Sequence, residues 1–182
     1  SDLADAPLVT HLRPGLSRVL AAEHDACSYG RVRAHGLARG EGEPIRLAIH
    51  RPGECGHEVG AVSESGEARE LVKEGGFDIA LLDLLMPAEA TTLGPEARVE
   101  HVGREIAIGF PLILSMAGQV GWIAVATDMN HHNHPMSAAV DWFMGDLSLV
   151  VNGTIVLVMH SPMNHDGTKN WALVLERLLA RT

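Results

Sequence analysis

The sequence predicts an α/β fold in which helices cover both faces of an open, mostly parallel sheet, with an N-terminal helix-strand extension. From residue 45 onward, short apolar runs of strand length alternate with segments of helical periodicity. Strands that are separated by helices pair in parallel through right-handed crossovers. The length fits one domain, so we expect a single domain over 1–182, divided into an extension over 1–44 and an α/β core over 45–182.

Four elements are expected before residue 76. Apolar residues between positions 16 and 22 favour a helix. A Gly-Gly pair at 75–76 is a stop signal for the helix that precedes it, and Ser63 is a candidate cap at the start of that helix. The four elements are a helix over 8–26, a strand over 28–37, a strand over 45–49 and a helix over 64–75.

The rest of the chain continues this alternation. Residues 96–118 fit either one helix or a strand followed by a second buried element. The apolar residues of the last segment fall on one side of a helix, which predicts a surface helix packed on the sheet. Apart from 96–118, the expected elements are a strand over 77–85, a strand over 120–127, a helix over 136–146, a strand over 153–159 and a helix over 168–180.

Composition narrows the classes of function. The net charge is −9 and no basic run is present, which argues against a nucleic-acid partner. No run of about 18 apolar residues occurs, so we expect no membrane span. Two cysteines are too few for a disulfide framework, and the N-terminus lacks a signal-peptide pattern, so we expect a reduced cytoplasmic protein. Self-association into a homo-oligomer stays open.

Histidines gather in two loops that each follow a strand-like apolar run. Five of the eleven histidines lie between residues 131 and 165. Imidazole is the commonest metal ligand and titrates near neutral pH. If the predicted strands are parallel, the loops that follow them open at one edge of the sheet, where open parallel sheets bind ligands. These loops begin after the strands at 45–49, 77–85, 120–127 and 153–159.

This clustering predicts a metal-dependent enzyme, a hydrolase, lyase or isomerase that acts on a small polar metabolite. The His-x-His pair at 132 and 134 would point both rings the same way in extended backbone. The expected metal ligands are His132, His134, His160 and Asp128, with zinc as the first choice of divalent metal and iron or manganese as alternatives. The expected acid–base residues are His165, Asp166 and His57.

Two other functions fit the same residues. The histidines and carboxylates could transfer protons without a metal, as in a dehydratase or isomerase. The loops could instead be ordinary surface loops, with the stretch from Asp166 to Lys169 capping the last helix or binding an anion at its N-terminus. In that case the protein would be a non-enzymatic regulatory or ligand-binding module.

The chain carries two stretches, Glu58-Val-Gly-Ala-Val-Ser-Glu-Ser-Gly-Glu-Ala-Arg-Glu-Leu-Val and Phe77-Asp-Ile-Ala-Leu-Leu-Asp83-Leu-Leu-Met-Pro87. Together they make residues 45–87 resemble the part of a response-regulator receiver domain that leads up to the phosphoacceptor. The resemblance implies an α/β fold and makes Asp83 the acceptor of a phosphoryl group.

Three departures from the receiver pattern accompany this resemblance. The acidic pair expected after the first strand, which would bind magnesium, is replaced by His50 and Arg51. The Gly-containing turn expected after Met86-Pro87 is missing, and neither of the two lysines follows a later strand in the expected place. Because phosphotransfer needs the metal and the lysine to neutralise charge, we do not expect a working receiver. In the alternative that the protein is a receiver-like regulatory or ligand-binding module, Asp83 would be vestigial.

Overall fold

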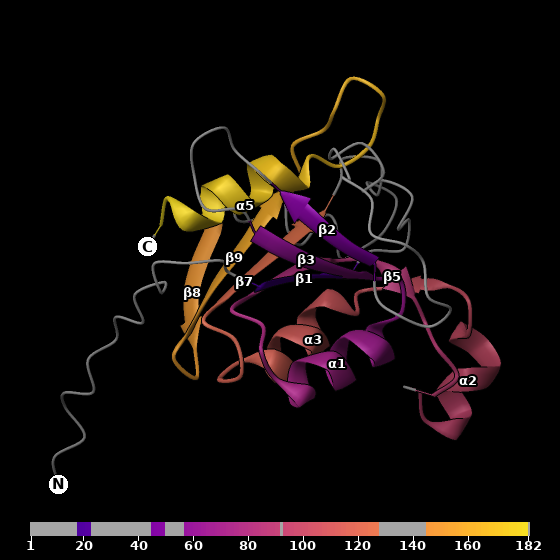
Figure 1. Ribbon diagram of the computed structural model, residues 1–182. Helices are drawn as coiled ribbons and strands as arrows, with labels where there is room; N and C mark the ends of the chain where they lie inside the picture. The colour runs from indigo at the N-terminus through magenta and orange to yellow at the C-terminus, as the bar shows by residue number, and fades with distance from the viewer. Residues whose placement is uncertain (1–17, 23–44, 50–56, 92, 128–144, 182) are drawn as a thin grey trace, which may run out of the picture.

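The computed structural model describes residues 18–22, 45–49, 57–91, 93–127 and 145–181 (Figure 1). They form a seven-stranded sheet and a separate two-stranded sheet. In spatial order, the strands of the large sheet are β2 (Ile45–Ile49), β3 (His57–Val62), β1 (Arg18–Ala22), β4 (Ile79–Asp83), β7 (Trp122–Thr127), β9 (Thr154–His160) and β8 (Leu147–Val151).

Five neighbouring strands of the large sheet run parallel, and the two outermost strands run antiparallel to them. The parallel strands are β3, β1, β4, β7 and β9, whereas β2 pairs antiparallel with β3 and β8 pairs antiparallel with β9. Numbered along the chain, the parallel strands have the order 2-1-3-4-5, which is a common order of doubly wound α/β folds. The predicted fold class is therefore confirmed.

Helices cover both faces of this sheet (Figure 1). On one face, α1 (Ser65–Glu74) and α3 (Gly109–Met116) pack over a core that includes Leu82 of β4. On the other face, α5 (Trp171–Leu179) packs over a core that includes the neighbouring Leu81. Successive strand residues face opposite sides, so a strand covered by helices on both sides is apolar throughout.

The N-terminal prediction is wrong where the structure describes it. The chain forms β1 at Arg18–Ala22 instead of a helix, and β1 lies between β3 and β4 in the middle of the sheet. Part of the expected N-terminal extension therefore belongs to the core. Four of the five β1 residues are buried, and a short apolar run of this kind has no periodicity that separates strand from helix. The strand expected over 28–37 lies outside the described residues.

Most later predictions are confirmed. The expected strand at 45–49 is β2, the helix over 64–75 is α1, and the last helix is α5. The N-cap residue of α1 is Glu64 rather than Ser63, while Gly75 ends the helix as expected. The sequence did not predict β8, and the helix expected over 136–146 lies almost entirely outside the described residues.

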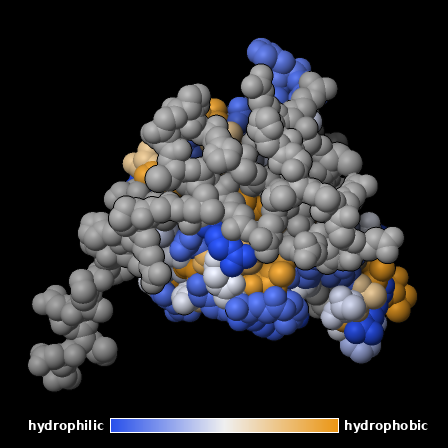
Figure 2. All heavy atoms as spheres, in the orientation of Figure 1, coloured by the Kyte–Doolittle hydropathy of each residue, from blue (hydrophilic) through white to orange (hydrophobic). Residues whose placement is uncertain are grey.

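The ambiguous segment 96–118 contributes to two helices. It also contributes to an excursion from the main sheet, which runs from residue 86 to residue 106. In it, β5 (Met86–Pro87) pairs with β6 (Glu105–Ile106), and α2 (Pro95–His101) lies between them without burying any residue. Hydrophobic residues appear at the surface near α2 in Figure 2, and Val99 is 92% exposed. Among the described residues, no helix is both long enough and apolar enough to cross a membrane.

Candidate functional site

Asp83 ends strand β4 at the carboxyl edge of the sheet, meaning the end where the five parallel strands finish. β4 lies between β1 and β7, and Asp83 is aligned with Ala126 of β7. In a sheet of order 2-1-3-4-5, the crevice used by ligands opens between the first and third strands, which here are β1 and β4. Asp83 is only 4% exposed, and a buried carboxylate is costly unless it is paired.

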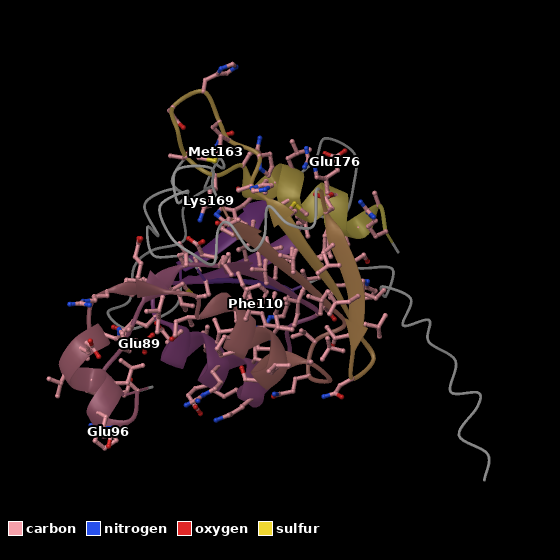
Figure 3. The ribbon with its side chains drawn as sticks, turned by 180° about the vertical axis from the view of Figure 1, so that it is seen from behind. Glu89, Glu96, Phe110, Met163, Lys169 and Glu176 are labelled. Atoms are coloured by element: carbon pink, nitrogen blue, oxygen red, sulfur yellow. The ribbon has the colours of Figure 1, made fainter. Side chains whose placement is uncertain are left out.

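The partner of Asp83 is Lys169. The Nζ atom of Lys169 donates a hydrogen bond to Oδ2 of Asp83, and Lys169 is 6% exposed. The backbone N–H of Leu85 donates to Oδ1 at 3.4 Å. Lys169 also lies over the ring of Trp171, with Nζ 5.8 Å from the ring centroid. Figure 3 shows Lys169 on the segment that leads into α5, beyond the ends of the central strands.

Thr127 adds a hydroxyl group at the end of the next strand. It follows Ala126 in β7, and its residue is 1% exposed. The backbone carbonyl of Thr127 accepts a hydrogen bond from the N–H of Ser161 at 2.6 Å. The Oγ1 atom is buried, and no hydrogen-bond partner for it is found among the described residues. A buried hydroxyl without a partner is costly, so a group that enters this edge can gain a hydrogen bond from it.

Gly109 lets helix α3 approach the backbone of Asp83. The N–H of Gly109 donates to the carbonyl of Leu84 at 3.0 Å. A Cβ atom at position 109 would lie 2.6 Å from the carbonyl oxygen of Asp83 and 2.9 Å from the Cα of Leu84. The turn after Met86-Pro87 contains no glycine, as the sequence indicates, and the close approach at Gly109 joins residues that no local pattern connects.

The structure describes only part of the predicted histidine site. His160 ends β9 and is aligned with Thr127 of β7, so it does lie at the carboxyl edge. His165 is exposed on the loop between β9 and α5. Asp166 lies on the same loop, and its Oδ1 atom accepts hydrogen bonds from the N–H and the hydroxyl of Thr168. The predicted ligands Asp128, His132 and His134 lie outside the described residues.

His57 does not belong to this edge. β3 begins at His57 and runs parallel to β1, so His57 marks the amino end of the parallel strands. β2 runs antiparallel to β3 and pairs Ile49 with His57, so the loop that joins them begins and ends there. The expectation that four loops converge on one edge is therefore wrong for the first loop, because the strand before it is antiparallel.

Two of the three departures from the receiver pattern also change with the topology. The first strand of the parallel sheet is β1, so Glu23, His24 and Asp25 follow it in sequence instead of His50 and Arg51, although all of these lie outside the described residues. No lysine directly follows a later strand, but Lys169 nevertheless reaches Asp83 from nine residues beyond the end of β9. An apolar strand followed by two carboxylates was the sequence signal that could have identified β1.

Within the described ranges, no group of three His, Cys, Asp or Glu side chains is arranged to hold a metal ion. Comparisons of the chain with models of protein families, with curated proteins and with solved structures found no match. A proposal for its function therefore depends on the side chains at the carboxyl edge.

Proposed function

We propose that the chain is a receiver-like regulatory module in which Asp83 accepts a phosphoryl group. The observation that carries this proposal is the buried ion pair of Asp83 and Lys169 at the point where the strand order reverses. Phosphoryl transfer depends on positioning and on fixed positive charge beside the transferred group. Because water is nearly excluded from both side chains, the ammonium group acts more strongly here than it would at the surface.

The proposed reaction is a displacement at phosphorus. A carboxylate oxygen of Asp83 attacks the phosphorus atom of a donor such as an acyl phosphate. The new O–P bond forms as the bond from phosphorus to the leaving oxygen breaks, and that oxygen keeps the electron pair. Lys169 neutralises the added charge, and the hydroxyl of Thr127 donates to a phosphoryl oxygen. The product replaces one carboxylate charge with a phosphoryl group, which is a change that can be transmitted through the fold.

Magnesium belongs to this proposal as the cation that accompanies the phosphodonor. Carboxylate oxygens are the protein ligands that magnesium prefers. Asp83 offers one carboxylate, and Glu23 and Asp25, which follow β1 in sequence, would supply two more. When bound, the cation would neutralise charge on the transferred group.

Mass spectrometry tests the proposal directly. The full chain is incubated with acetyl phosphate and magnesium, and the modified residue is located. We expect one phosphoryl group on the wild type and none on Asp83→Asn. Asp146→Asn is the control and should react normally, because Asp146 pairs with Arg181 at the surface. A folded wild type that takes up no phosphoryl group, or equal uptake by Asp83→Asn, would overturn the proposal.

A zinc-dependent enzyme is the second proposal. It is supported by the alignment of Thr127 with His160, because the predicted ligand Asp128 directly follows Thr127 in sequence. Elemental analysis of the purified protein tests it. One zinc, iron or manganese per chain, lost when His132 and His134 are both replaced by Ala, would support a metal site. Unchanged metal content in that double variant would rule these ligands out.

A further inference from the structure

The loop between β9 and α5 folds into a narrow hairpin of its own. It spans residues 161–170, between the end of β9 and the start of α5. The N–H of Asn170 donates to the carbonyl of Pro162 at 2.7 Å, and the N–H of Asn164 donates to the carbonyl of Thr168 at 2.8 Å. Met163 and Lys169 form an antiparallel bridge between these two contacts. Lys169 therefore lies on the returning arm of a hairpin.

Polar side chains close the turn of this hairpin. Oδ1 of Asp166 accepts from the hydroxyl of Thr168 at 2.6 Å and from its N–H at 3.1 Å. The side-chain amide of Asn164 donates to the hydroxyl of Thr168 at 2.9 Å and to the carbonyl of Lys169 at 3.4 Å. Gly167 adopts a φ of 83°, in the left-handed region that favours glycine. These contacts lie within five residues of sequence, so they form locally.

The other side of Lys169 is held by the helix that follows. Asn170 is the N-cap of α5, and its side chain accepts from the N–H of Leu173 at 3.0 Å. The backbone of Lys169 is therefore fixed between the closed turn and the capped helix. A lysine side chain loses conformational entropy when it is held in one place. A backbone that is already fixed reduces the entropy that must be lost when the ion pair forms.

We propose that Asn164 and Asp166 are positioning residues, which hold Lys169 against Asp83 through the hairpin. The inference rests on the proposed role of Asp83, because it concerns how the lysine of that site is supplied. A lysine directly after β9 would need no such support. Here the chain continues past the strand and returns, so the turn decides where the ammonium group arrives.

Labelling of lysine amines tests the positioning without relying on phosphorylation. The chain contains two lysines, and Lys73 is exposed whereas Lys169 is buried. An acetylating reagent followed by mass spectrometry measures the two rates separately, with Lys73 as the internal reference. In Asn164→Ala and Asp166→Ala, we expect Lys169 to be labelled about tenfold faster, because the hairpin opens locally. His165→Ala, at the exposed tip, should leave both rates unchanged.

Phosphorylation provides the second measurement. With acetyl phosphate and magnesium, Asp166→Ala should slow the modification of Asp83 by about tenfold or more, as expected when a charged group is misplaced. The same substitution should have little further effect in a Lys169→Met background, because it acts through that lysine. Additive effects in the double variant would mean that Asp166 acts by another route and would overturn the inference.

The outcomes separate this inference from the proposed function. If the wild type takes up no phosphoryl group, the proposed function fails, while the labelling of Lys169 still decides whether the hairpin positions it. Unchanged labelling in both Ala variants overturns the inference even when Asp83 is phosphorylated. If those variants unfold, Thr168→Val is the milder substitution, because it removes only the hydroxyl that Asp166 and Asn164 share.

Discussion

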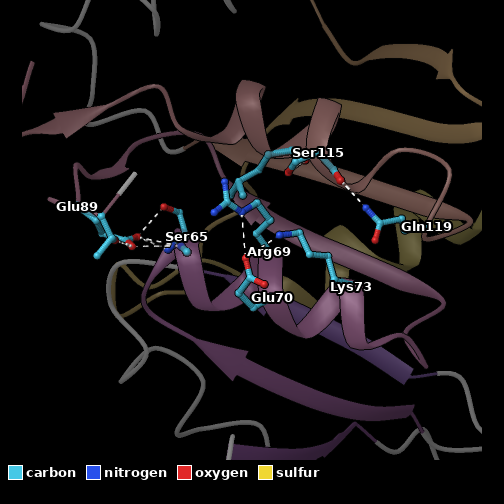
Figure 4. Close-up of polar contacts among 10 residues, drawn as sticks. Ser65, Arg69, Glu70, Lys73, Glu89, Ser115 and Gln119 are labelled. Atoms are coloured by element: carbon cyan, nitrogen blue, oxygen red, sulfur yellow. Dashed lines mark hydrogen bonds and ion pairs between the residues drawn. The ribbon is translucent and has the colours of Figure 1, made fainter. Parts of the chain in front are cut away.

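The two lysines of this chain form ion pairs in opposite environments. Lys73 lies on the exposed side of α1, and its Nζ is 2.8 Å from Oε1 of Glu70, three residues earlier (Figure 4). Lys169 lies in the interior and pairs with Asp83, 86 residues away in sequence. Exposed ion pairs contribute little to stability, whereas a buried pair becomes costly as soon as one partner is removed. Burial, and not residue type, therefore distinguishes the pair that marks a site.

The largest effect should come from breaking the buried pair. Lys169→Met leaves the carboxylate of Asp83 buried without its cation, and we expect the free energy of unfolding to fall by about 3–5 kcal/mol. Lys73→Met is the matched control, with little change expected in chemical denaturation. Equal losses in the two variants would contradict the comparison. Replacing both Asp83 and Lys169 by Leu and Met should recover most of the loss, because no unpaired charge is left.

The backbone behind the buried pair is expected to be the next most sensitive position. Gly109→Ala places a Cβ atom 2.6 Å from the carbonyl of Asp83, so the chain must move. We expect a loss of about 1–3 kcal/mol in the free energy of unfolding, measured by denaturation. Gly121→Ala is the control, since its added Cβ would lie at an ordinary 3.6 Å from the carbonyl of Asp78. Tolerance of Ala at position 109 would show that α3 can move away from β4.

Glu89 is an intermediate case between the two ion pairs. Its half-buried carboxylate accepts from the hydroxyl of Ser65 at 2.6 Å and from the N–H of Gly66 at 3.2 Å, so it caps α1 from the excursion (Figure 4). Glu89→Ala should cost about 0.5–2 kcal/mol, as loss of an N-cap does. Thermal unfolding measures this, with the exposed Glu96→Ala as control. No difference between the two variants would mean that water replaces the cap.

The smallest effect concerns the pH dependence of the exposed pair. The hydrogen bond from Lys73 holds the pKa of Glu70 below its ordinary value. A carboxyl group whose pKa is lowered on folding adds stability above its unfolded pKa and loses it as pH falls through the folded one. Melting temperatures of wild type and Lys73→Met should therefore differ slightly near neutral pH and converge below about pH 4. A gap that widened in acid would contradict this assignment.

The sequence predicted the elements better than their arrangement. Local hydrophobic patterns predict several elements, because each pattern depends only on nearby residues. These elements are the strands β4, β7 and β9 and the helix α1. β1 was predicted as part of a helix, because a short strand buried on both faces has no alternation to reveal it. That error placed the first strand at residues 45–49 and assigned His57 to the wrong edge of the sheet.

The sequence located Asp83 but not the contacts around it. Asp83 follows an apolar run, so parallel pairing places it at the carboxyl edge, although it was not among the expected metal-binding or acid–base residues. Asp83 and Lys169 are 86 positions apart, and Glu89 lies 23 positions from Gly66, which it helps to cap. Gly109 approaches the backbone of Asp83 from beyond the excursion. No sequence spacing encodes contacts of this kind.

By itself, the sequence determined an α/β fold, the identity of most strands and helices, and a carboxylate at the end of a buried strand. These properties depend on hydrophobic periodicity and turn residues, which act within a few positions. Only the tertiary structure decided that β1 lies inside the sheet between β3 and β4, that His57 lies at the amino end of the parallel strands, and that one of two lysines is buried against Asp83. Those outcomes depend on strand order and on burial, which are set when distant segments pack together.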